Sequence, residues 1–438
     1  MSSPNSNLPI LRHTAPTPPS SPVPPFSRRN DCESRSSAAS GLLAPSPRDA
    51  RTIGHKGSVV ALAYSHNSKL LATGACDAAI ILWDASNKTI LHKLEAHVYE
   101  VCALAFSPDD QRLASACPGG KVIVWSVQTG ERLGTMDQHE PSLLKNHAIK
   151  LLLAWSADGR WIASGAFIIQ NTVHLWDADT FEKKRIFEHD GVFFVGFSHD
   201  SLWLVSCGMD NCARIWDVAQ GAPYAVLRGP EDIIAPNSEH VMHHADFDAD
   251  DRRLVTCSSD HSVLVWNIEG GENDKSVDRA ECVEEGKSVE AGNIVKSGKI
   301  LVRFPEEPRN SALYVAFSND GTRVLTVLYP DGMMRLHDSL TGQCQVTFEG
   351  HKKPIHSICF SPDQEYIASG SSDNTVRLWR VSDGALLRMF TDHQCEVNVV
   401  MFSPDGSTLT SGGSDDTVRI RLAHEWLPGP AVAPVEED

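Results

Sequence analysis

The stretch "SICFSPDQEYIASGSSDNTVRLWR" (Ser357–Arg380) decides the fold of this chain. It contains three short apolar runs, which are separated by polar residues that include "SPDQ" and "SSDN". Short runs rich in Ile, Val and Leu between Ser, Pro, Asp and Gly predict β-strands joined by tight turns. We therefore expect three strands in this stretch and a fourth strand in "GALLRMF" (Gly384–Phe390).

The same pattern recurs eight times from residue 51 onward. Three further clear copies are "VALAYSHNSKLLATGACDAAIILWD" (Val60–Asp84), "FVGFSHDSLWLVSCGMDNCARIWD" (Phe194–Asp217) and "VVMFSPDGSTLTSGGSDDTVRIRL" (Val399–Leu422). The units close at Trp83, Trp125, Trp176, Trp216, Trp266, His337, Trp379 and Arg421. Four strands in about 42 residues, repeated along a chain, predict an all-β propeller. Each small sheet then buries its two faces against its neighbours in a ring.

Two of the eight units are irregular. The third contains two extra residues in "ASGAFIIQNTVHLW" (Ala163–Trp176), and the sixth ends in His337 instead of tryptophan. A seven-bladed ring is therefore the alternative. Both units keep the pattern of three strands, so we expect a single propeller of eight four-stranded blades.

The units resemble WD repeats, which have a Gly-His-like start, a central Ser-Pro-Asp and a Trp-Asp-like end. The resemblance covers roughly residues 51–424. In that family the two ends of the chain share one blade, which closes the ring. Here "ARTI" (Ala50–Ile53) precedes the first unit, and the last unit ends after its third strand. The resemblance thus implies that Ala50–Ile53 is the outer strand of the last blade.

Serine, aspartate and tryptophan recur at fixed offsets in these units. Ser369 lies ten residues and Asp373 six residues before Trp379, and His351 lies upstream. Serine, histidine and aspartate are also the components of a nucleophilic triad, so a catalytic site is the alternative. The resemblance to WD repeats instead implies a chain of hydrogen bonds from the indole N–H to the hydroxyl, on to the histidine and on to the aspartate. Such a network satisfies buried polar groups and makes a blade rigid.

Several units contain this set of side chains, some of them incompletely. The complete sets are His55, Thr73, Asp77 and Trp83; His189, Ser206, Asp210 and Trp216; and His351, Ser369, Asp373 and Trp379. The partial sets are His97, Ser115 and Trp125; Thr256, Asp260 and Trp266; and His393, Ser411 and Asp415. A catalytic triad occurs once per site, whereas these groups recur and are lost one at a time. We therefore interpret them as structural and expect that the protein is not an enzyme.

Charge and cysteines limit the other classes of function. A net charge of −17 at pH 7 repels nucleic-acid phosphate, and no run of Lys or Arg forms a basic patch. The 11 cysteines are scattered without zinc-site spacing, which favours reduced thiols in an intracellular protein of the cytoplasm or the nucleus. No apolar run approaches the roughly 20 residues that span a bilayer, and no apolar signal segment begins the chain. "HVMHHADFDADD" (His240–Asp251) fails the calcium-loop template, so we expect no metal and no other cofactor.

The chain divides into a propeller and two tails. Residues 1–50 are rich in Pro and Ser and are predicted to be disordered. Phosphorylation of this tail and docking of its PxxP spacings on SH3-like domains both stay open. We expect the propeller over residues 51–424, an acidic insertion at 270–297 between a third and a fourth strand, and a short acidic tail at 425–438.

A propeller without catalytic groups predicts a scaffold that assembles complexes with other proteins or peptides, as a monomeric ring within the complex. Loops on a rigid scaffold usually carry the binding residues, and two long loops at 136–148 and 228–240 lead into first strands. The candidate binding residues on this face are Lys56, Ser58, Met209, Lys352, Lys353, Ser372 and Ser414. The alternative function is reading of phosphopeptides or modified histones by these lysines. An enzyme at the central channel is the least favoured function.

Overall fold

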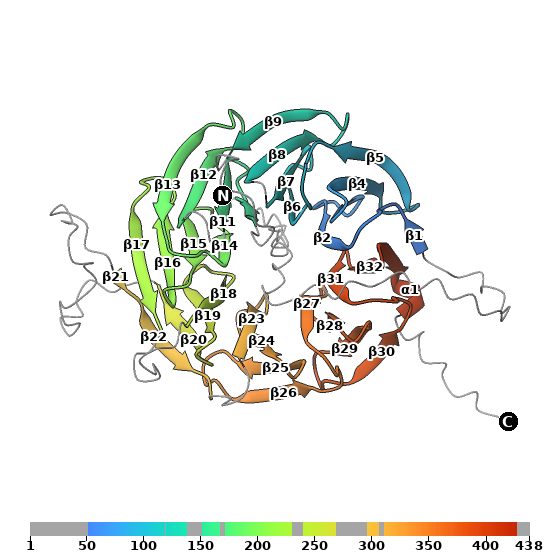
Figure 1. Cartoon of the computed structure of the whole chain (residues 1–438). Coiled ribbons are helices and arrows are strands. Elements are labelled where there is room, and N and C mark those ends of the chain that lie inside the picture. The colour runs from blue at the N-terminus through green and yellow to red at the C-terminus, as the bar shows by residue number, and fades with distance from the viewer. Residues whose placement is uncertain are drawn as a thin grey trace, which may run out of the picture.

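The computed structural model describes residues 51–118, 120–137, 151–166, 171–229, 240–268, 296–305 and 311–426. Eight antiparallel sheets are arranged in a ring around a central axis, one sheet for each unit of the sequence (Figure 1). The prediction of an all-β propeller with eight blades is therefore confirmed, and the seven-bladed alternative is wrong. The predicted tail at 1–50 and most of the predicted tail at 425–438 lie outside the described residues.

The blades are numbered in chain order, with their strands given from the inner to the outer edge. Blade 1 consists of β2 (Val59–Tyr64), β3 (Leu70–Ala75), β4 (Ala79–Asp84) and β5 (Thr89–Glu95); blade 2 of β6 (Ala103–Phe106), β7 (Arg112–Cys117), β8 (Lys121–Ser126) and β9 (Arg132–Asp137); blade 3 of β10 (Leu151–Trp155), β11 (Trp161–Ala166), β12 (Thr172–Asp177) and β13 (Lys183–Glu188); and blade 4 of β14 (Phe194–Phe197), β15 (Trp203–Cys207), β16 (Cys212–Asp217) and β17 (Pro223–Arg228). Blade 5 consists of β18 (Met242–Phe247), β19 (Arg253–Ser258), β20 (Val263–Asn267) and β22 (Lys299–Arg303); blade 6 of β23 (Ser311–Phe317), β24 (Arg323–Tyr329), β25 (Met333–Asp338) and β26 (Cys344–Phe348); blade 7 of β27 (Ile355–Phe360), β28 (Tyr366–Ser371), β29 (Val376–Arg380) and β30 (Leu386–Phe390); and blade 8 of β31 (Val397–Phe402), β32 (Thr408–Gly413), β33 (Thr417–Leu422) and β1 (Arg51–Ile53).

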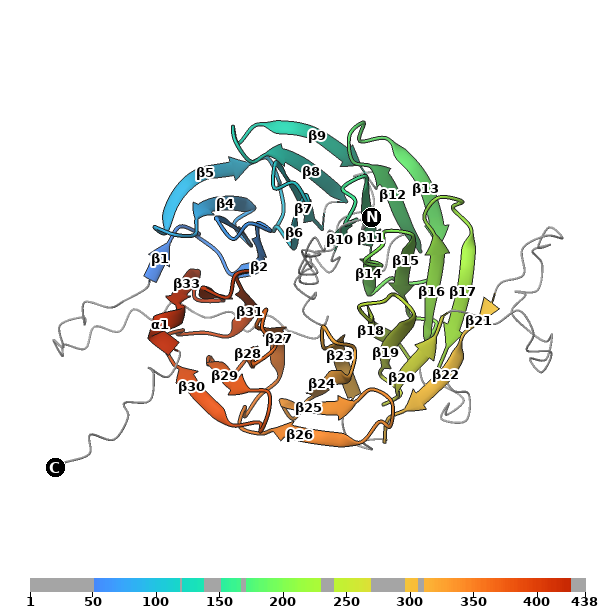
Figure 2. The same cartoon turned by 180° about the vertical axis from the view of Figure 1, so that it is seen from behind.

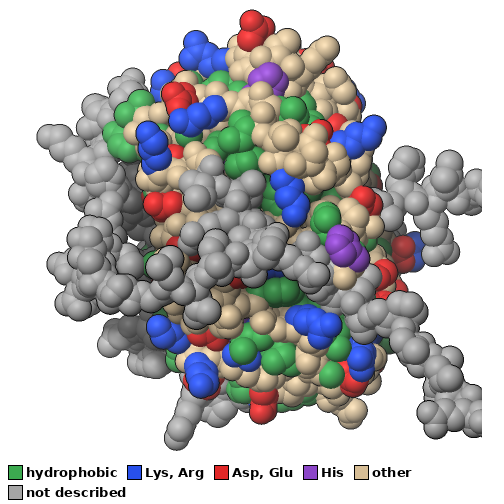
Figure 3. Space-filling model, turned by 90° about the vertical axis from the view of Figure 1, so that its right-hand side faces the viewer, with side chains coloured by type: hydrophobic (Ala, Val, Ile, Leu, Met, Phe, Trp, Pro, Cys, Tyr) green, Lys and Arg blue, Asp and Glu red, His purple; other side chains and the backbone are tan. Residues whose placement is uncertain are grey.

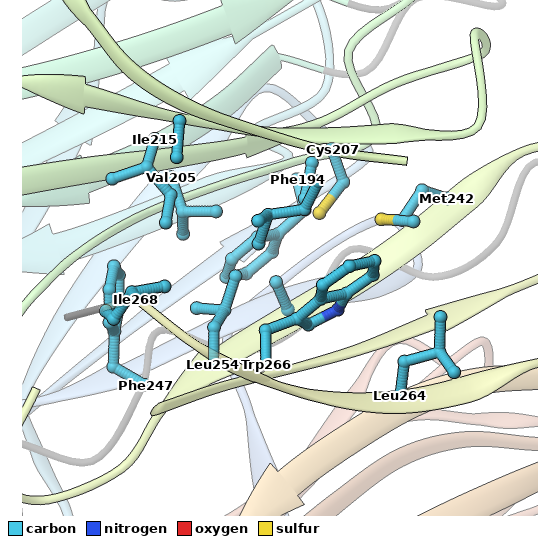
Figure 4. Close-up of a cluster of buried hydrophobic side chains, with 14 residues drawn as sticks. Phe194, Val205, Cys207, Ile215, Met242, Phe247, Leu254, Leu264, Trp266 and Ile268 are labelled. Atoms are coloured by element: carbon cyan, nitrogen blue, oxygen red, sulfur yellow. The ribbon is translucent and has the colours of Figure 1, made fainter. Parts of the chain in front are cut away.

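The hydrophobic core lies between the blades, because each sheet is too small to bury its faces alone. Figure 4 shows the cluster between blades 4 and 5, where Phe194 and Ile215 of one sheet pack with Met242 and Trp266 of the next. These side chains are all at most 6% exposed. Burying one large apolar side chain contributes about 1.5–3 kcal/mol, so each blade depends on its neighbours for its stability.

The ring closes where the two ends of the described chain meet in blade 8, as the resemblance implied. Strand β1 pairs antiparallel with β33, with Arg51 opposite Arg419 and Ile53 opposite Thr417. Seen from behind, β1 and β33 lie side by side between blades 7 and 1 (Figure 2). The Tyr64 hydroxyl of blade 1 also reaches blade 8, where it bonds Thr408 Oγ1 at 2.8 Å.

We call one end of the blades the top face, because the loops into the inner strands and the turns between second and third strands lie there. The turns between first and second strands, such as Ser65–Ser68, lie at the opposite end, which we call the bottom face. On the bottom face, adjacent blades are tied by side chains that accept backbone N–H groups. Asp110 of blade 2 accepts the N–H groups of His66 (2.7 Å) and Asn67 (2.9 Å) of blade 1. We call such a contact a turn tie.

Turn ties recur at four further junctions. Each acceptor belongs to the fourth residue of a turn, which has a positive φ, and each donor belongs to the turn of the preceding blade. The further acceptors are Ser201, Asp251, Gln364 and Ser68, and their donors are the N–H groups of Asp158, of His199 and Asp200, of Asn319, and of Asp405.

The other three junctions have glycine as the fourth turn residue, namely Gly159, Gly321 and Gly406. Before two of these glycines, the preceding turn has Pro108 or Pro362, which lacks an N–H to donate. At two of these three junctions an arginine forms a hydrogen bond to the next blade instead. Arg112 donates to the carbonyl of Ala178 at 2.6 Å, and Arg253 donates to the carbonyl of Gly321 at 2.7 Å.

Strand β22 is the outer strand of blade 5 and pairs with β20, so the acidic insertion lies between the third and fourth strands of this blade in the chain. Its boundary differs from the prediction. Lys296–Ser297 forms strand β21, which pairs in parallel with β17 and adds a fifth strand to blade 4. A second unpredicted element is the one-turn helix α1 (Ala423–Trp426), which directly follows β33. Most of the insertion itself lies outside the described residues.

Several outer strands leave large hydrophobic side chains exposed, among them Ile90 on β5 and Met389 on β30. Figure 3 shows the side of the ring that carries β1 and α1, and hydrophobic side chains there are interspersed with charged ones. Charges next to the free edge of a sheet oppose pairing with the edge of another molecule.

Ring closure by β1 yields the first prediction. Deleting residues 1–53 removes the partner of β33, whereas deleting residues 1–50 keeps all of β1. Loss of two to three backbone hydrogen bonds should lower the free energy of unfolding by about 1–4 kcal/mol. Urea unfolding should therefore separate the two truncations, with the shorter deletion close to the full chain. Equal midpoints for both would show that β1 does not stabilise the ring.

Candidate functional site

The predicted set of blade 7 is brought together on the top face. His351 precedes β27, and Asp373 lies in the turn between β28 and β29. His351 Nε2 lies 2.7 Å from Ser369 Oγ, and His351 Nδ1 lies 2.8 Å from Asp373 Oδ2. Trp379 Nε1 donates to Ser369 Oγ at 2.9 Å. Asp373 also accepts the backbone N–H of Lys352 at 3.3 Å, so the chain of bonds reaches from the blade interior to the lead-in loop.

The complete sets of blades 1 and 4 have the same connections. In blade 1, His55 lies 2.8 Å from Thr73 Oγ1 and 3.1 Å from Asp77 Oδ1. In blade 4, the His189 ring is reversed, because Nδ1 faces Ser206 at 2.7 Å and Nε2 faces Asp210 at 3.1 Å. The indole N–H groups donate to the same hydroxyls: Trp83 to Thr73 at 3.0 Å and Trp216 to Ser206 at 2.9 Å.

Burial fixes the protonation state of these groups. Burial lowers the pKa of His351 and outweighs the opposing effect of Asp373, so the ring is neutral at pH 7. Burial alone would raise the pKa of Asp373, but hydrogen bonds from His351 and Thr375 outweigh it and lower the pKa. A neutral ring that donates to a carboxylate through Nδ1 accepts at Nε2, where the serine hydroxyl donates. Each side-chain polar atom in this series of hydrogen bonds therefore has a partner.

The geometry does not favour the catalytic alternative for these residues. Ser369, Thr73 and Ser206 are all 0% exposed, so no substrate reaches their hydroxyls without opening the blade. Each hydroxyl already accepts an indole N–H. A nucleophile needs an accessible oxygen beside the reacting atom.

The partial set of blade 8 is completed by a residue that the sequence analysis treated as a loss. His393 lies 2.8 Å from Ser411 Oγ and 3.0 Å from Asp415 Oδ1. Arg421 replaces the tryptophan, and its guanidinium donates to Ser411 Oγ at 2.9 Å and to Asp392 at 2.7 Å. An arginine at the closing position therefore supplies the same donor as an indole.

The partial set of blade 2 lacks the aspartate. His97 Nε2 lies 2.7 Å from Ser115 Oγ, which accepts the Trp125 N–H at 2.8 Å. His97 Nδ1 is buried, and none of the described residues forms a hydrogen bond with it. Burial, assisted by Lys121, lowers the pKa of His97 to about 4.

In blades 3, 5 and 6 the closing residue and the hydroxyl are bonded to each other, and within the described residues no histidine extends this pair to an aspartate. Trp176 donates to Ser164 at 2.8 Å, and Trp266 donates to Thr256 at 2.9 Å. In blade 6, His337 takes the tryptophan position and lies 3.3 Å from Thr326 Oγ1.

Asp260 of blade 5 has a partner that was not predicted. No histidine of its own blade is bonded to it in the described part of the chain. Instead, Asn211 of blade 4 donates to Asp260 Oδ2 at 2.9 Å. Asn211 Oδ1 accepts the Ser258 hydroxyl at 2.6 Å, so one amide bridges the two blades.

The histidines and aspartates of residues 240–251 point to different neighbours. His244 lies between the rings of Phe194 (4.1 Å) and Tyr314 (4.3 Å), and burial lowers its pKa to about 3. Asp248 binds Arg253 at 2.7 Å, and Asp251 belongs to a turn tie. Within the described residues, no group of three or more potential metal ligands is gathered anywhere.

The candidate binding residues differ in exposure. Lys56, Lys352 and Lys353 are exposed on the top face, and Met209 is 38% exposed. Ser58 and Ser414 are half-buried and bonded to each other at 3.1 Å.

Ser372 differs from the expectation of an outward-facing residue. It is only 7% exposed, and its hydroxyl is bonded to His356 Nε2. The sequence analysis missed His356, Glu396 and Asn398, which line the same part of the top face. His356 and Asn398 both lie one residue after the first core position of an inner strand, and comparing this position between units would have found them.

Two general findings concern the described residues. None of their helices has the length and apolar character needed to cross a membrane. All nine of their cysteines are free thiols.

A family model described as "WD40: WD domain, G-beta repeat" matches seven segments of the chain. The matched segments are residues 48–84, 88–126, 133–177, 181–217, 233–267, 342–380 and 384–421. The gap between 267 and 342 contains β23 to β25 of blade 6, where the structure nevertheless has a complete blade.

Three curated relatives and one solved structure illustrate the similarity. The chain is 31% identical over 159 residues to the Xenopus laevis "WD repeat and HMG-box DNA-binding protein 1" (33% of this chain, 14% of the relative). It is 27% identical over 224 residues to the Gallus gallus "Serine-threonine kinase receptor-associated protein" (49% and 62%). It is 24% identical over 249 residues to the Arabidopsis thaliana "Transcriptional corepressor LEUNIG_HOMOLOG" (56% and 26%). A crystal structure of the computationally designed Ika8 protein superposes with a TM-score of 0.65 and 25% identity, over 84% of this chain and 97% of that one.

The matches cover less than two thirds of each of these three relatives. The similarity therefore concerns the propeller and not the remainder of those proteins.

The hydrogen-bonded set of blade 7 yields a stability prediction. Asp373→Ala removes the acceptor of the His351 Nδ1–H and of the Lys352 N–H, so the free energy of unfolding should fall by about 1–3 kcal/mol. Asp383→Ala is the matched control, since the Asp383 side chain is 49% exposed in a turn of the same blade and should leave the unfolding midpoint nearly unchanged. Urea unfolding of both variants measures the difference. An unchanged midpoint for Asp373→Ala would refute the structural interpretation.

The buried histidines yield a pH prediction. The pKa values of His55, His189 and His351 lie below the usual 6.5, because burial disfavours the charged ring. Below pH 6.5 the unfolded chain binds protons that the folded chain does not, so stability falls as the pH falls. His199, whose pKa is raised by its hydrogen bond to Asp251, and Asp246, whose pKa burial raises to about 7, contribute stability that is lost as the pH rises, and they oppose the trend of the more numerous buried histidines. The melting temperature should therefore decrease from pH 7.5 to pH 5.0 at constant ionic strength, and a constant or rising value contradicts this.

Proposed function

Because this chain belongs to the WD domain, G-beta repeat family, we propose that it is a non-catalytic scaffold that assembles a protein complex through its top face. The observation that carries this proposal is the immobilisation of the top-face loops. In blades 1, 7 and 8 the aspartate holds the backbone N–H of the residue after the histidine, at 2.8, 3.3 and 2.9 Å. Ordering a loop before binding reduces the entropy cost of recognition.

The exposed side chains beside these fixed amides form the proposed binding surface. Lys56 follows His55, and Lys352 and Lys353 follow His351. Blade 8 lies between blades 1 and 7, so these lysines occupy one sector of the ring (Figure 1). Met209 lies on the opposite sector, in blade 4, and supplies an exposed apolar contact. Charged and apolar groups of this kind are typical of a protein-binding rim around a core.

Two relatives carry names that fit such a role, namely a receptor-associated protein and a transcriptional corepressor. The chain shares only its propeller with them, so the shared property is the ring of loops and not a pathway. We propose that the protein acts inside the cell, in the cytoplasm or the nucleus, as one propeller within a larger complex. The free thiols of its described residues support an intracellular environment.

The proposed surface yields a binding prediction. The triple variant Lys56→Glu, Lys352→Glu and Lys353→Glu reverses three exposed charges on the top face, and Lys69→Glu reverses one on the bottom face. Affinity purification of each tagged full-length variant, followed by quantitative mass spectrometry, should show that the triple variant loses partners that Lys69→Glu retains. Melting curves establish that both variants are folded. Identical partner sets for the wild type and the triple variant would place binding elsewhere.

The alternative function, recognition of phosphorylated peptides, has its own test. Three lysines in one sector can attract a phosphate by charge. Matched peptides with serine or phosphoserine distinguish the two functions, because a phosphate reader requires tight binding of the phosphorylated peptide alone.

A further inference from the structure

The hydrogen-bonded set of blade 2 lacks the carboxylate that the sets of blades 1, 4, 7 and 8 contain. Asp77, Asp373 and Asp415 lie six residues before the residue that closes their units, and the sequence has Gly119 at this position in blade 2. The other members of the set remain, since His97, Ser115 and Trp125 form the same two hydrogen bonds as in blade 7. The network of blade 2 therefore ends at the histidine.

The histidine ring has an unused polar atom at this point, Nδ1, which is a donor when the Ser115 hydroxyl donates to Nε2. Its Nε2 faces the Ser115 hydroxyl, as the Nε2 atoms of His55, His351 and His393 face theirs. In those three blades Nδ1 is bonded to a carboxylate at 2.8 to 3.1 Å. His97 is only 9% exposed, and its Nδ1 has no hydrogen-bond partner among the residues that the structure describes. An unsatisfied buried donor costs about 1–3 kcal/mol, which an incoming acceptor would recover.

A second donor lies beside the first one. In blades 1, 7 and 8 the carboxylate also accepts the N–H of the residue after the histidine. The corresponding residue of blade 2 is Val98, which is 81% exposed, and its N–H forms no hydrogen bond within the described part of the chain. Both donors that hold the carboxylate in other blades are thus available in blade 2.

The charge around this position also favours an anion. Lys121 occupies the place of Thr375 in blade 7, whose hydroxyl donates to Asp373 at 2.6 Å. The Lys121 side chain is 47% exposed, and its ammonium group lies 3.7 Å from Asp137. Of the two acidic residues nearest His97 in sequence, Glu95 forms an ion pair with Lys93, and Glu100 accepts the Cys76 thiol at 3.4 Å. The chain therefore places a half-exposed cation at this position, and its ion pair with the exposed Asp137 is loose enough for Lys121 to attract an entering anion as well.

We propose that His97, the Val98 N–H and Lys121 form a carboxylate-binding site, which a partner protein fills with an aspartate or glutamate side chain or with its C-terminal carboxylate. The bound group takes the place that Asp373 has in blade 7 and completes the hydrogen-bonded set of blade 2 in trans. The inference rests on the proposed function to the extent that a partner approaches the top face. Nδ1 is shielded from solvent. The atoms that shield it therefore have to move aside when the carboxylate enters next to the exposed Val98 and Lys121.

Three short peptides test the site on the full-length protein. The first is acetyl-Gly-Asp-Gly-amide, which offers a side-chain carboxylate, and the second is acetyl-Gly-Gly-Gly with a free C-terminus. The third, acetyl-Gly-Asn-Gly-amide, is the neutral control. NMR of protein with ¹⁵N-labelled histidine, assigned by the loss of one signal in His97→Gln, should show a saturable shift of the His97 nitrogens with a carboxylate peptide and none with the control. The stronger of the two carboxylate peptides identifies the source of the group.

Gly119→Asp supplies the carboxylate in cis and should weaken the response to the carboxylate peptides by at least about tenfold, the factor expected for one charge-assisted hydrogen bond. Gly119→Ala is the matched control, because it adds a Cβ without an acceptor and should keep the response. Gly119→Asp should also melt at a higher temperature than Gly119→Ala.

The inference is overturned if a carboxylate peptide shifts the wild type and Gly119→Asp alike. It is also overturned if no peptide shifts the His97 signals and Gly119→Asp melts no higher than Gly119→Ala. Neither result depends on the partner sets of the lysine variants, so the proposed function can fail or stand separately.

Discussion

One polar side chain buried at the end of the third strand of each blade is the constraint on which the rest of the structure depends. In all eight blades a residue at the end of the third strand interacts with a serine or threonine hydroxyl of the second strand. Six of these residues are tryptophans, and the other two are His337 and Arg421. A buried N–H without an acceptor is costly, so the hydroxyl persists even where every other member of the set is lost. The histidine and the aspartate extend this pair toward the top face, where they fix the loops.

Blades that lose the outer members of the set are stabilised by contacts with their neighbours. Blades 5 and 6 lie side by side, and neither has a hydrogen bond from a histidine to the aspartate of the set within its described residues. Arg253 joins them by donating to Gly321 and Ser339, while Asp246 accepts the Phe317 N–H at 2.8 Å. Burial raises the pKa of Asp246 to about 7. The junction therefore relies on side chains that bond the adjacent blade directly, and not on a network inside one blade.

The fold could be predicted from the sequence because each blade is formed almost entirely by residues that are close together in the chain. The first three strands of each blade are encoded by one continuous stretch such as Ser357–Arg380, and its spacing places Ser369 and Trp379 on adjacent strands, with Asp373 in the turn between them. The role of Arg421 was not predictable, since an arginine offers no sign that it replaces an indole until its neighbours are known. Contacts between blades, such as Asn211 with Asp260, join residues roughly 50 positions apart and depend on side-chain direction. The burial of Ser372 was missed for the same reason.

The turn ties on the bottom face determine which blades can be neighbours. At five junctions a side chain of one turn accepts a backbone N–H of the preceding turn. At the other three junctions the fourth turn residue is a glycine, which lies next to a proline or an arginine of the preceding blade. Moving blade 3 to follow blade 1 would set Gly159 against His66 and leave that N–H without its acceptor. The backbone repeats eight times, but the junctions are not all alike, so the blades are not freely interchangeable. Opening the ring at a different loop would preserve every junction, whereas exchanging two blades would not.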